Sequence, residues 1–197
     1  EAKFEEIIIS LNEKDINKKL NKLDKDSKKD KFKKLASFID AVDKDRRDTI
    51  LFLVEGDSAK SHFPIVRNKN KHGMLPLRGK VLGAYNSTLA KVLENKELTD
   101  LMNIVGLKIG YKTDTRYYDK IAILTDADVD GNHIASMLML FFYKYFPHLY
   151  EQKRIVKVMS PIVICIKGKE IRRFYEYDDF LKNQAMFTTG WRIEYNK

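Results

Sequence analysis

The 197-residue sequence predicts an α/β protein in which a mostly parallel sheet is flanked by helices. Two apolar runs, residues 50–55 and 121–125, have the composition of buried strands, and both lead into acidic turns that contain glycine. The chain between them is long enough for the crossover that parallel strands require. A third apolar stretch, residues 134–146, is too long for a strand and is expected to form a helix buried against the sheet.

The remaining elements are predicted in chain order. Residues 1–48 are rich in Lys and Asp, with Ile, Leu and Phe at helical spacing, which indicates a helical N-terminal extension. Residues 49–165 are expected to form the core, with a third strand over 156–164 and an amphipathic helix over 86–101. Residues 166–197 have the pattern of a hairpin followed by a helix, a tail that we expect to lead into a C-terminal part missing from this chain.

Charge and cysteine content restrict the function classes. The net charge is +9, and the excess of basic residues lies between residues 60 and 112. Basic charge alone would also suit RNA or a membrane surface, but beside an acidic phosphate-handling site it favours nucleic acid. The single cysteine, Cys165, can form neither an intrachain disulfide nor a zinc site by itself, which fits a reducing compartment. We expect no secretory signal, and residues 134–146 are too few to span a bilayer.

The most informative string is IAILTDADVDG, in which a strand delivers alternating carboxylates to a turn. Asp126, Asp128 and Asp130 would repel one another unless a cation lies among them, and a hard ion such as Mg²⁺ suits carboxylate oxygens. Glu55 lies at the end of the strand expected over 50–55, in the string ILFLVEGDSAK. Because two strands deliver acids to turns, we expect one shared site beyond their carboxyl ends.

The acids also allow other interpretations, which neighbouring residues argue for or against. An EF-hand loop would need a bidentate Glu at its twelfth position, which is Met137, and a helix rather than a strand before it. A phosphatase of the haloacid dehalogenase type would use Asp126 as nucleophile and Asp128 as general acid, but Asp130 stands where Thr or Val is usual. A solvated acidic loop, an ordinary capped turn after Glu55, and a DNA-binding module with merely structural acids stay open.

Three strings, EGDSAK at 55–60, PLRGK at 76–80 and TDADVDGNHI at 125–134, resemble the signature strings of the Toprim domain of type II DNA topoisomerases, in the same order and spacing. The resemblance runs from about Asp45 to the end of the chain. It implies the Toprim fold, which is Rossmann-like. It also implies that residues 1–48 are the end of a transducer helix and the linker that follows it. Toprim domains as a class, including those of primases and type I topoisomerases, share only the Glu and the DxD pair. PLRGK therefore favours the type II group over another DNA enzyme such as a primase or nuclease. The residue 60–72 segment is more similar to the phage and eukaryotic branches than to gyrase.

The resemblance also implies roles for individual residues. Glu55, Asp126 and Asp128 would be catalytic, and together with Asp130 they would hold one or two Mg²⁺ ions. The residues implied at the DNA are Lys60, Arg78, Gly79, Lys80 and His133. The chain departs from the family at Gly83, where many relatives carry a DNA-contacting Asn, and we do not transfer that role to Asn86.

The implied chemistry is incomplete in this chain. The family attacks DNA with a tyrosine from a separate winged-helix region, and the pair Arg116–Tyr117 does not correspond to it, so Tyr117 is expected to be structural. No GxxxxGKS string is present, so ATP is expected to bind only the full-length enzyme and not this chain. The resemblance implies an ATP-dependent type II topoisomerase that cleaves and religates double-stranded DNA.

The same resemblance implies the partners. They are double-stranded DNA and a tyrosine-bearing cleavage domain or subunit, in a homodimer or heterotetramer, with no membrane association. The expected compartment is the cytoplasm, that of the host in the case of a phage, or the nucleus in a eukaryote. Whether the enzyme relaxes, supercoils or decatenates DNA depends on other domains.

Overall fold

The computed structural model describes residues 18, 37–56, 59–77, 87–110, 117–126 and 128–196. Most of the expected N-terminal helical extension therefore lies outside the described residues, and so do Arg78, Gly79, Lys80 and Gly83. For Lys60 the structure describes the backbone within a helix but not the side chain.

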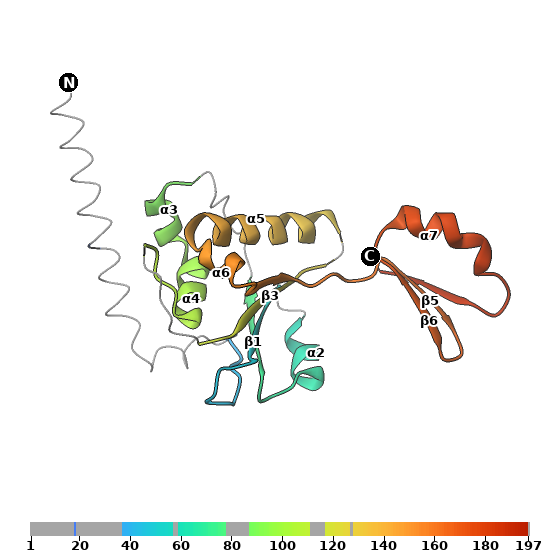
Figure 1. The fold of residues 1–197 in the computed structure, drawn as a ribbon, viewed down its shortest axis with the longest axis horizontal. Coiled ribbons are helices and arrows are strands. Elements are labelled where there is room, and N and C mark those ends of the chain that lie inside the picture. Colours follow the sequence, from blue (N-terminus) through green and yellow to red (C-terminus); the bar gives the residue numbers. More distant parts are fainter. Residues whose placement is uncertain are drawn as a thin grey trace, which may run out of the picture.

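A four-stranded parallel sheet forms the centre of the molecule, with strand order β2-β1-β3-β4 (Figure 1). Its strands are β1 (Ile50–Glu55), β2 (His72–Leu77), β3 (Lys120–Leu124) and β4 (Ile155–Lys157). Helices lie on both faces, which confirms the predicted α/β class. Because β1 and β3 are parallel neighbours in the middle of the sheet, their carboxyl ends reach the same edge, as the sequence predicted.

The two faces of β1 bury different side chains because successive residues of a strand point to opposite sides. Leu51 and Leu53 belong to the main hydrophobic core, whereas Val54 belongs to a smaller cluster with Phe63 of a helix and Met74 of β2. The main core lies between the sheet and the helices drawn above it in Figure 1. Among the described residues, no helix is both long and apolar enough to cross a membrane.

Five helices accompany the parallel sheet: α2 (Ala59–Val66), α3 (Leu89–Glu94), α4 (Lys96–Val105), α5 (Val129–Tyr145) and α6 (His148–Glu151). Figure 1 shows α2 on one side of the sheet and α3, α4, α5 and α6 on the other. Helix α5 buries Leu138, Phe141 and Phe142 against the sheet, while Tyr143 on its outer side is exposed. This helix accounts for the expected buried segment 134–146, but it begins five residues earlier than predicted and ends at Tyr145, with Phe146 as its C-cap.

A second, antiparallel sheet of order β6-β5-β7 forms a separate C-terminal unit. It comprises β5 (Val163–Lys167), β6 (Glu170–Phe174), α7 (Tyr177–Asn183), the short 3₁₀ helix η2 (Gln184–Met186) and β7 (Arg192–Tyr195). Val163, Cys165 and Phe180 are its fully buried residues. Figure 1 shows this unit beyond one edge of the parallel sheet, joined to it by a single extended segment.

A polar network closes the edge of the sheet remote from the acids. The Tyr118 hydroxyl donates a hydrogen bond to Asp40, and Arg46 forms an ion pair with Asp40 at 3.1 Å while its guanidinium lies over the Tyr118 ring. A Cβ at Gly73 would collide with the Tyr118 hydroxyl, so this position needs glycine. The buried Arg154 donates to the Tyr118 carbonyl at 2.6 Å. Residues 40–46 are thereby held against the start of β3.

Three sequence expectations about elements were incomplete or wrong. The strand expected over 156–164 is two strands, β4 and β5, which belong to different sheets, because Pro161 between them has no N–H to continue a ladder. The helix expected over 86–101 is divided into α3 and α4 at Asn95, whose side chain caps α4. Strand β2 was not predicted, since it contains Gly73 and Pro76, but as an edge strand it tolerates proline.

Candidate active site

Glu55 and Asp126 meet where two parallel strands end. Val54 of β1 lies opposite Leu124 of β3, so the next residues of both strands emerge side by side. The backbone N–H of Asp126 donates a hydrogen bond to the Glu55 carboxylate. The crevice beyond the carboxyl ends of parallel strands is where α/β folds place their ligands, and the two acids predicted to share a site are neighbours there.

The environment of Glu55 disfavours its charged form. Burial and then the negative charges of Asp126 and Asp128 raise the pKa of Glu55, while the hydrogen bond from the Asp126 backbone acts in the opposite direction. Its Oε2 atom is buried and has no hydrogen-bond partner among the described residues. A buried carboxylate oxygen without a partner is costly unless a cation or donor completes it. The acidic residues therefore suit a hard divalent cation for two reasons. Carboxylate oxygens are the ligands that such ions prefer, and the buried Glu55 Oε2 lacks a partner among the described residues.

Asp128 has a structural role that the sequence analysis missed. It is the N-cap of α5, and its Oδ1 accepts a hydrogen bond from the Gly131 N–H at 2.8 Å. A Cβ on Gly131 would collide with the backbone oxygen of Asp126, so glycine lets the helix start against the turn that carries the acids. The string D-x-D-G could have revealed this cap, because Asp is a favoured N-cap residue and its partner is three residues later.

The other predicted site residues at the start of α5 are exposed. Asp126, Asp128 and Asp130 are exposed, and so is His133 in the first turns of the helix. Within the described parts of the chain, no three His, Cys, Asp or Glu side chains gather closely enough to form a complete metal-binding group. The acids are therefore assembled on one edge, but they do not form a closed cage of ligands.

The chain also brings the end of β2 to this edge. Leu77 lies opposite Glu55, and the Leu77 carbonyl accepts a hydrogen bond from the Gly56 N–H at 2.9 Å. The PLRGK string thus begins within β2 and leaves the described part of the chain beside Glu55. Tyr117 packs against the main core near the start of β3, at the opposite end of that strand from the acids.

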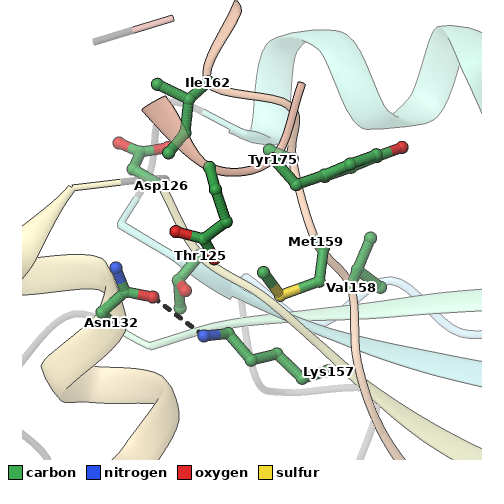
Figure 2. A pocket seen from close by; sticks show the side chains of 10 residues that line it. Thr125, Asp126, Asn132, Lys157, Val158, Met159, Ile162 and Tyr175 are labelled. Carbon is green, nitrogen blue, oxygen red and sulfur yellow. Dashed lines mark hydrogen bonds between the residues drawn. The ribbon is translucent and has the colours of Figure 1, made fainter. Parts of the chain in front are cut away.

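A partly open hollow adjoins Asp126 on the side of the C-terminal unit (Figure 2). Its volume is about 220 Å³. Lys157 of β4 extends into it and donates from Nζ to the Asn132 Oδ1 of α5 at 2.8 Å. The lining residues are Thr125, Asp126, Asn132, Lys157, Val158, Met159, Ser160, Ile162, Tyr175 and Glu176. Sequence reasoning did not find Lys157 or Asn132, because only the register of β4 beside β3 brings them together.

Comparisons with known proteins identify the family of this chain. The Toprim domain family model matches residues 50–161. A DNA gyrase subunit of Metamycoplasma hominis is 39% identical over 138 residues, which are 69% of this chain and 21% of that protein. DNA topoisomerase 2 of Caenorhabditis elegans is 34% identical over 196 residues, which are 93% of this chain and 13% of that protein. The chain thus spans about a fifth or less of these relatives.

A solved structure gives the same result at the level of the fold. The DNA-binding, cleavage and re-ligation domain of Plasmodium falciparum topoisomerase II superposes with a TM-score of 0.72 at 30% identity, covering 83% of this chain and 24% of that one. Bacterial and eukaryotic proteins are thus both among the relatives. The chain belongs to the Toprim domain family, and its Toprim region is that of the type II topoisomerases.

Proposed function

We propose that this chain is the Mg²⁺-binding part of an ATP-dependent type II topoisomerase that cleaves and religates double-stranded DNA. The observation that carries the proposal is the placement of Glu55 beside Asp126 at the shared carboxyl edge of β1 and β3, with a buried Glu55 oxygen that lacks a partner among the described residues. The family membership of the chain supports this assignment over an isolated acidic turn.

In this proposal Glu55, Asp126, Asp128 and Asp130 hold one or two Mg²⁺ ions, which when bound offset negative charge on the scissile phosphate. Glu55 also exchanges a proton with the 3′ oxygen of the cleaved strand. Its raised pKa supports this role, because a carboxyl group works best as an acid or base when its pKa lies closer to the working pH. Arg78, Gly79, Lys80, His133 and Lys60 contact the DNA backbone, which basic side chains and backbone N–H groups suit.

The remaining parts of the reaction come from outside this chain. A tyrosine in another region or subunit supplies the nucleophile, and ATP binds elsewhere in the full-length enzyme. The assembly is a homodimer or heterotetramer on double-stranded DNA, in the cytoplasm or, for a eukaryotic enzyme, the nucleus. The names of the relatives, DNA gyrase and DNA topoisomerase, support DNA as the substrate.

Glu55→Gln and Asp126→Asn, made in the full-length enzyme with its cleavage partner, test the proposal. Each is expected to lower the rate of Mg²⁺-dependent DNA cleavage about 100-fold or more, equivalent to about 3 kcal/mol of transition-state stabilisation. The measurement is the yield of cleaved plasmid against time over a Mg²⁺ titration. Glu151→Gln is the matched control, since Glu151 is an exposed acid on α6, which precedes the amino end of β4.

Full cleavage activity in Glu55→Gln would remove Glu55 from the reaction and with it the observation on which the proposal rests. A phosphoaspartate trapped at Asp126 with a phosphate ester substrate would instead assign the acids to a phosphatase.

A further inference from the structure

The hollow beside Asp126 presents hydrogen-bond donors next to the acids. Lys157 brings an ammonium group from β4, Asn132 brings an amide from the first turns of α5, and Thr125 and Ser160 add hydroxyl groups. These groups come from separate elements and loops that the sheet register places together. The chemistry of such a set suits an anionic oxygen ligand.

A hydrogen bond holds the Lys157 side chain in one orientation. Its Nζ donates to the Asn132 Oδ1 at 2.8 Å, and Lys157 is only partly exposed. An ammonium has three N–H donors, and among the described residues this is the one hydrogen bond that Lys157 makes, so further donors remain for a ligand. The same contact fixes the Asn132 amide, and Figure 2 shows the amide nitrogen turned toward Asp126. Two donor groups are thus held facing the same space.

The charge of the hollow decides which anion fits. Asp126 and Glu176 line it, and Lys157 is the single cationic side chain among its lining residues. The carboxylates would repel a small free anion. A phosphodiester of a nucleic acid could still occupy the hollow, because contacts of the same strand elsewhere on the protein would offset this repulsion. The N-terminal end of α5, a 17-residue helix, adds a favourable dipole on the same side.

We propose that Lys157 and Asn132 form a phosphate subsite that holds a backbone phosphodiester of the DNA beside the acids at the ends of β1 and β3. This inference rests on the proposed function, because it requires that DNA binds at the acids. The subsite would then place one DNA strand beside Asp126, on the side that faces the C-terminal unit. The chemistry recognised is a phosphate oxygen, which a free phosphate also offers, and the experiment separates these two sources.

The test is DNA binding by the full-length protein, measured as fluorescence anisotropy of a labelled duplex in EDTA over a salt series of roughly 50–200 mM KCl. EDTA makes the readout independent of cleavage. Lys157→Gln is expected to weaken binding roughly three- to ten-fold for every duplex sequence and to reduce the slope of log K against log salt by about 0.9, the loss of one phosphate contact. Lys157→Arg keeps the charge and is expected to restore the slope.

Lys120→Gln is the matched control, because Lys120 is an exposed lysine at the amino end of β3, the end remote from the acids. It removes the same charge and is expected to leave the slope unchanged. Asn132→Ala is expected to reduce affinity as well, and the double variant should lose little more than Lys157→Gln alone, because the two side chains act as one unit.

Equal slopes for Lys157→Gln and the unaltered protein would overturn the subsite while leaving the Mg²⁺ assignment intact. An equal reduction of the salt slope in Lys120→Gln would also overturn the subsite, since the reduction would then follow from the lower net charge of the protein and not from a contact at Lys157. Calorimetric binding of inorganic phosphate that requires Lys157, with DNA binding unaltered, would reassign the subsite to free phosphate. Failure of the proposed function has a different signature, namely full Mg²⁺-dependent cleavage in Glu55→Gln.

Discussion

The fold places Glu55 where the charged form of its carboxyl group is unfavourable. Its Oε2 is buried without a partner among the described residues, and Asp126 and Asp128 add repulsion to the effect of burial. Functional sites commonly keep such unfavourable groups because the ligand, when bound, offsets them. The carboxylate is therefore expected to limit the stability of the metal-free protein.

Replacing Glu55 by Gln tests this at the level of stability. Because the pKa of Glu55 is raised in the folded state, its contribution to stability is full below the ordinary value of 4.5 and is lost as pH rises through the folded pKa. Without metal near neutral pH, Glu55→Gln is expected to be more stable by roughly 0.5–1 kcal/mol. Urea unfolding near neutral pH and again below the ordinary pKa measures the difference, which should disappear at the lower pH. Equal stability at neutral pH would contradict the cost assigned to the charge.

The sequence was sufficient to predict the pairing of acids but not every neighbour. Glu55 and Asp126 follow apolar strands, and parallel strands of one sheet present their ends together, so their proximity needed only local patterns. Lys157 lies in a three-residue strand whose partner is set by tertiary structure, so nothing local linked it to Asn132. Arg78 and Lys80 lie outside the described residues, and their placement at the DNA stays a prediction.

At the scale of elements, helix α5 depends on a residue that the proposed chemistry also uses. The Asp128 side chain caps the helix through the Gly131 N–H, and a carboxylate there also interacts favourably with the helix dipole. The cap uses only Oδ1, and an ionised carboxylate has a second oxygen that can bind a cation. Structural and functional contributions of Asp128 can thus be separated by the choice of substitution.

Asp128→Asn keeps a capping oxygen but removes the charge, whereas Asp128→Ala removes both. Asn is expected to leave the stability of the protein within about 0.5 kcal/mol, and Ala to lower it by about 1 kcal/mol, as for other N-caps. Both should impair Mg²⁺-dependent cleavage in the full-length enzyme. Thermal unfolding and cleavage assays on the same preparations provide the comparison, and equal destabilisation by Asn and Ala would contradict the capping role.

Element boundaries were the least predictable part of the fold. Asn95 divides an apparently continuous amphipathic pattern because its side chain accepts from the Leu98 N–H and starts a new helix. Strand β2 carries Gly73, which is required by the approach of Tyr118, a residue distant in sequence. Such boundaries are set by single side-chain contacts across the fold, whereas the long apolar helix α5 was predictable from its pattern alone.

At the scale of the whole molecule, the described hydrophobic clusters divide between the two sheets, which implies two units of stability. The parallel sheet and the C-terminal sheet share no strand among the described residues, and the buried cluster around Phe180 is separate from the main core. Residues 158–162 join them and also line part of the hollow beside Asp126. The C-terminal unit is small, so it is expected to open locally at lower free energy than the parallel sheet.

Phe180→Ala tests this independence. Deleting a fully buried aromatic ring is expected to cost about 3–5 kcal/mol, enough to open the C-terminal unit while the parallel sheet stays folded. Hydrogen exchange should then accelerate at amides of β5, β6 and β7 but not of β1 and β3. Leu181→Ala on the same helix is the control, because Leu181 is 46% exposed and its loss should cost little. Uniform acceleration in both sheets would show a single cooperative unit.

The anchoring of Asp40 by Tyr118 determines how mechanical load would enter the molecule. A pull applied at residue 37 first loads the backbone hydrogen bonds between Ile39 and Met74 of β2, and then the bonds of Asp40 to Tyr118 and Arg46, before it reaches β1. Tyr118 lies two residues before the start of β3, and β3 is hydrogen-bonded to β1 on one side and to β4 on the other. Load that enters at Asp40 is therefore passed through side-chain contacts to the strand that ends beside Asp126, in parallel with the backbone of residues 41–49.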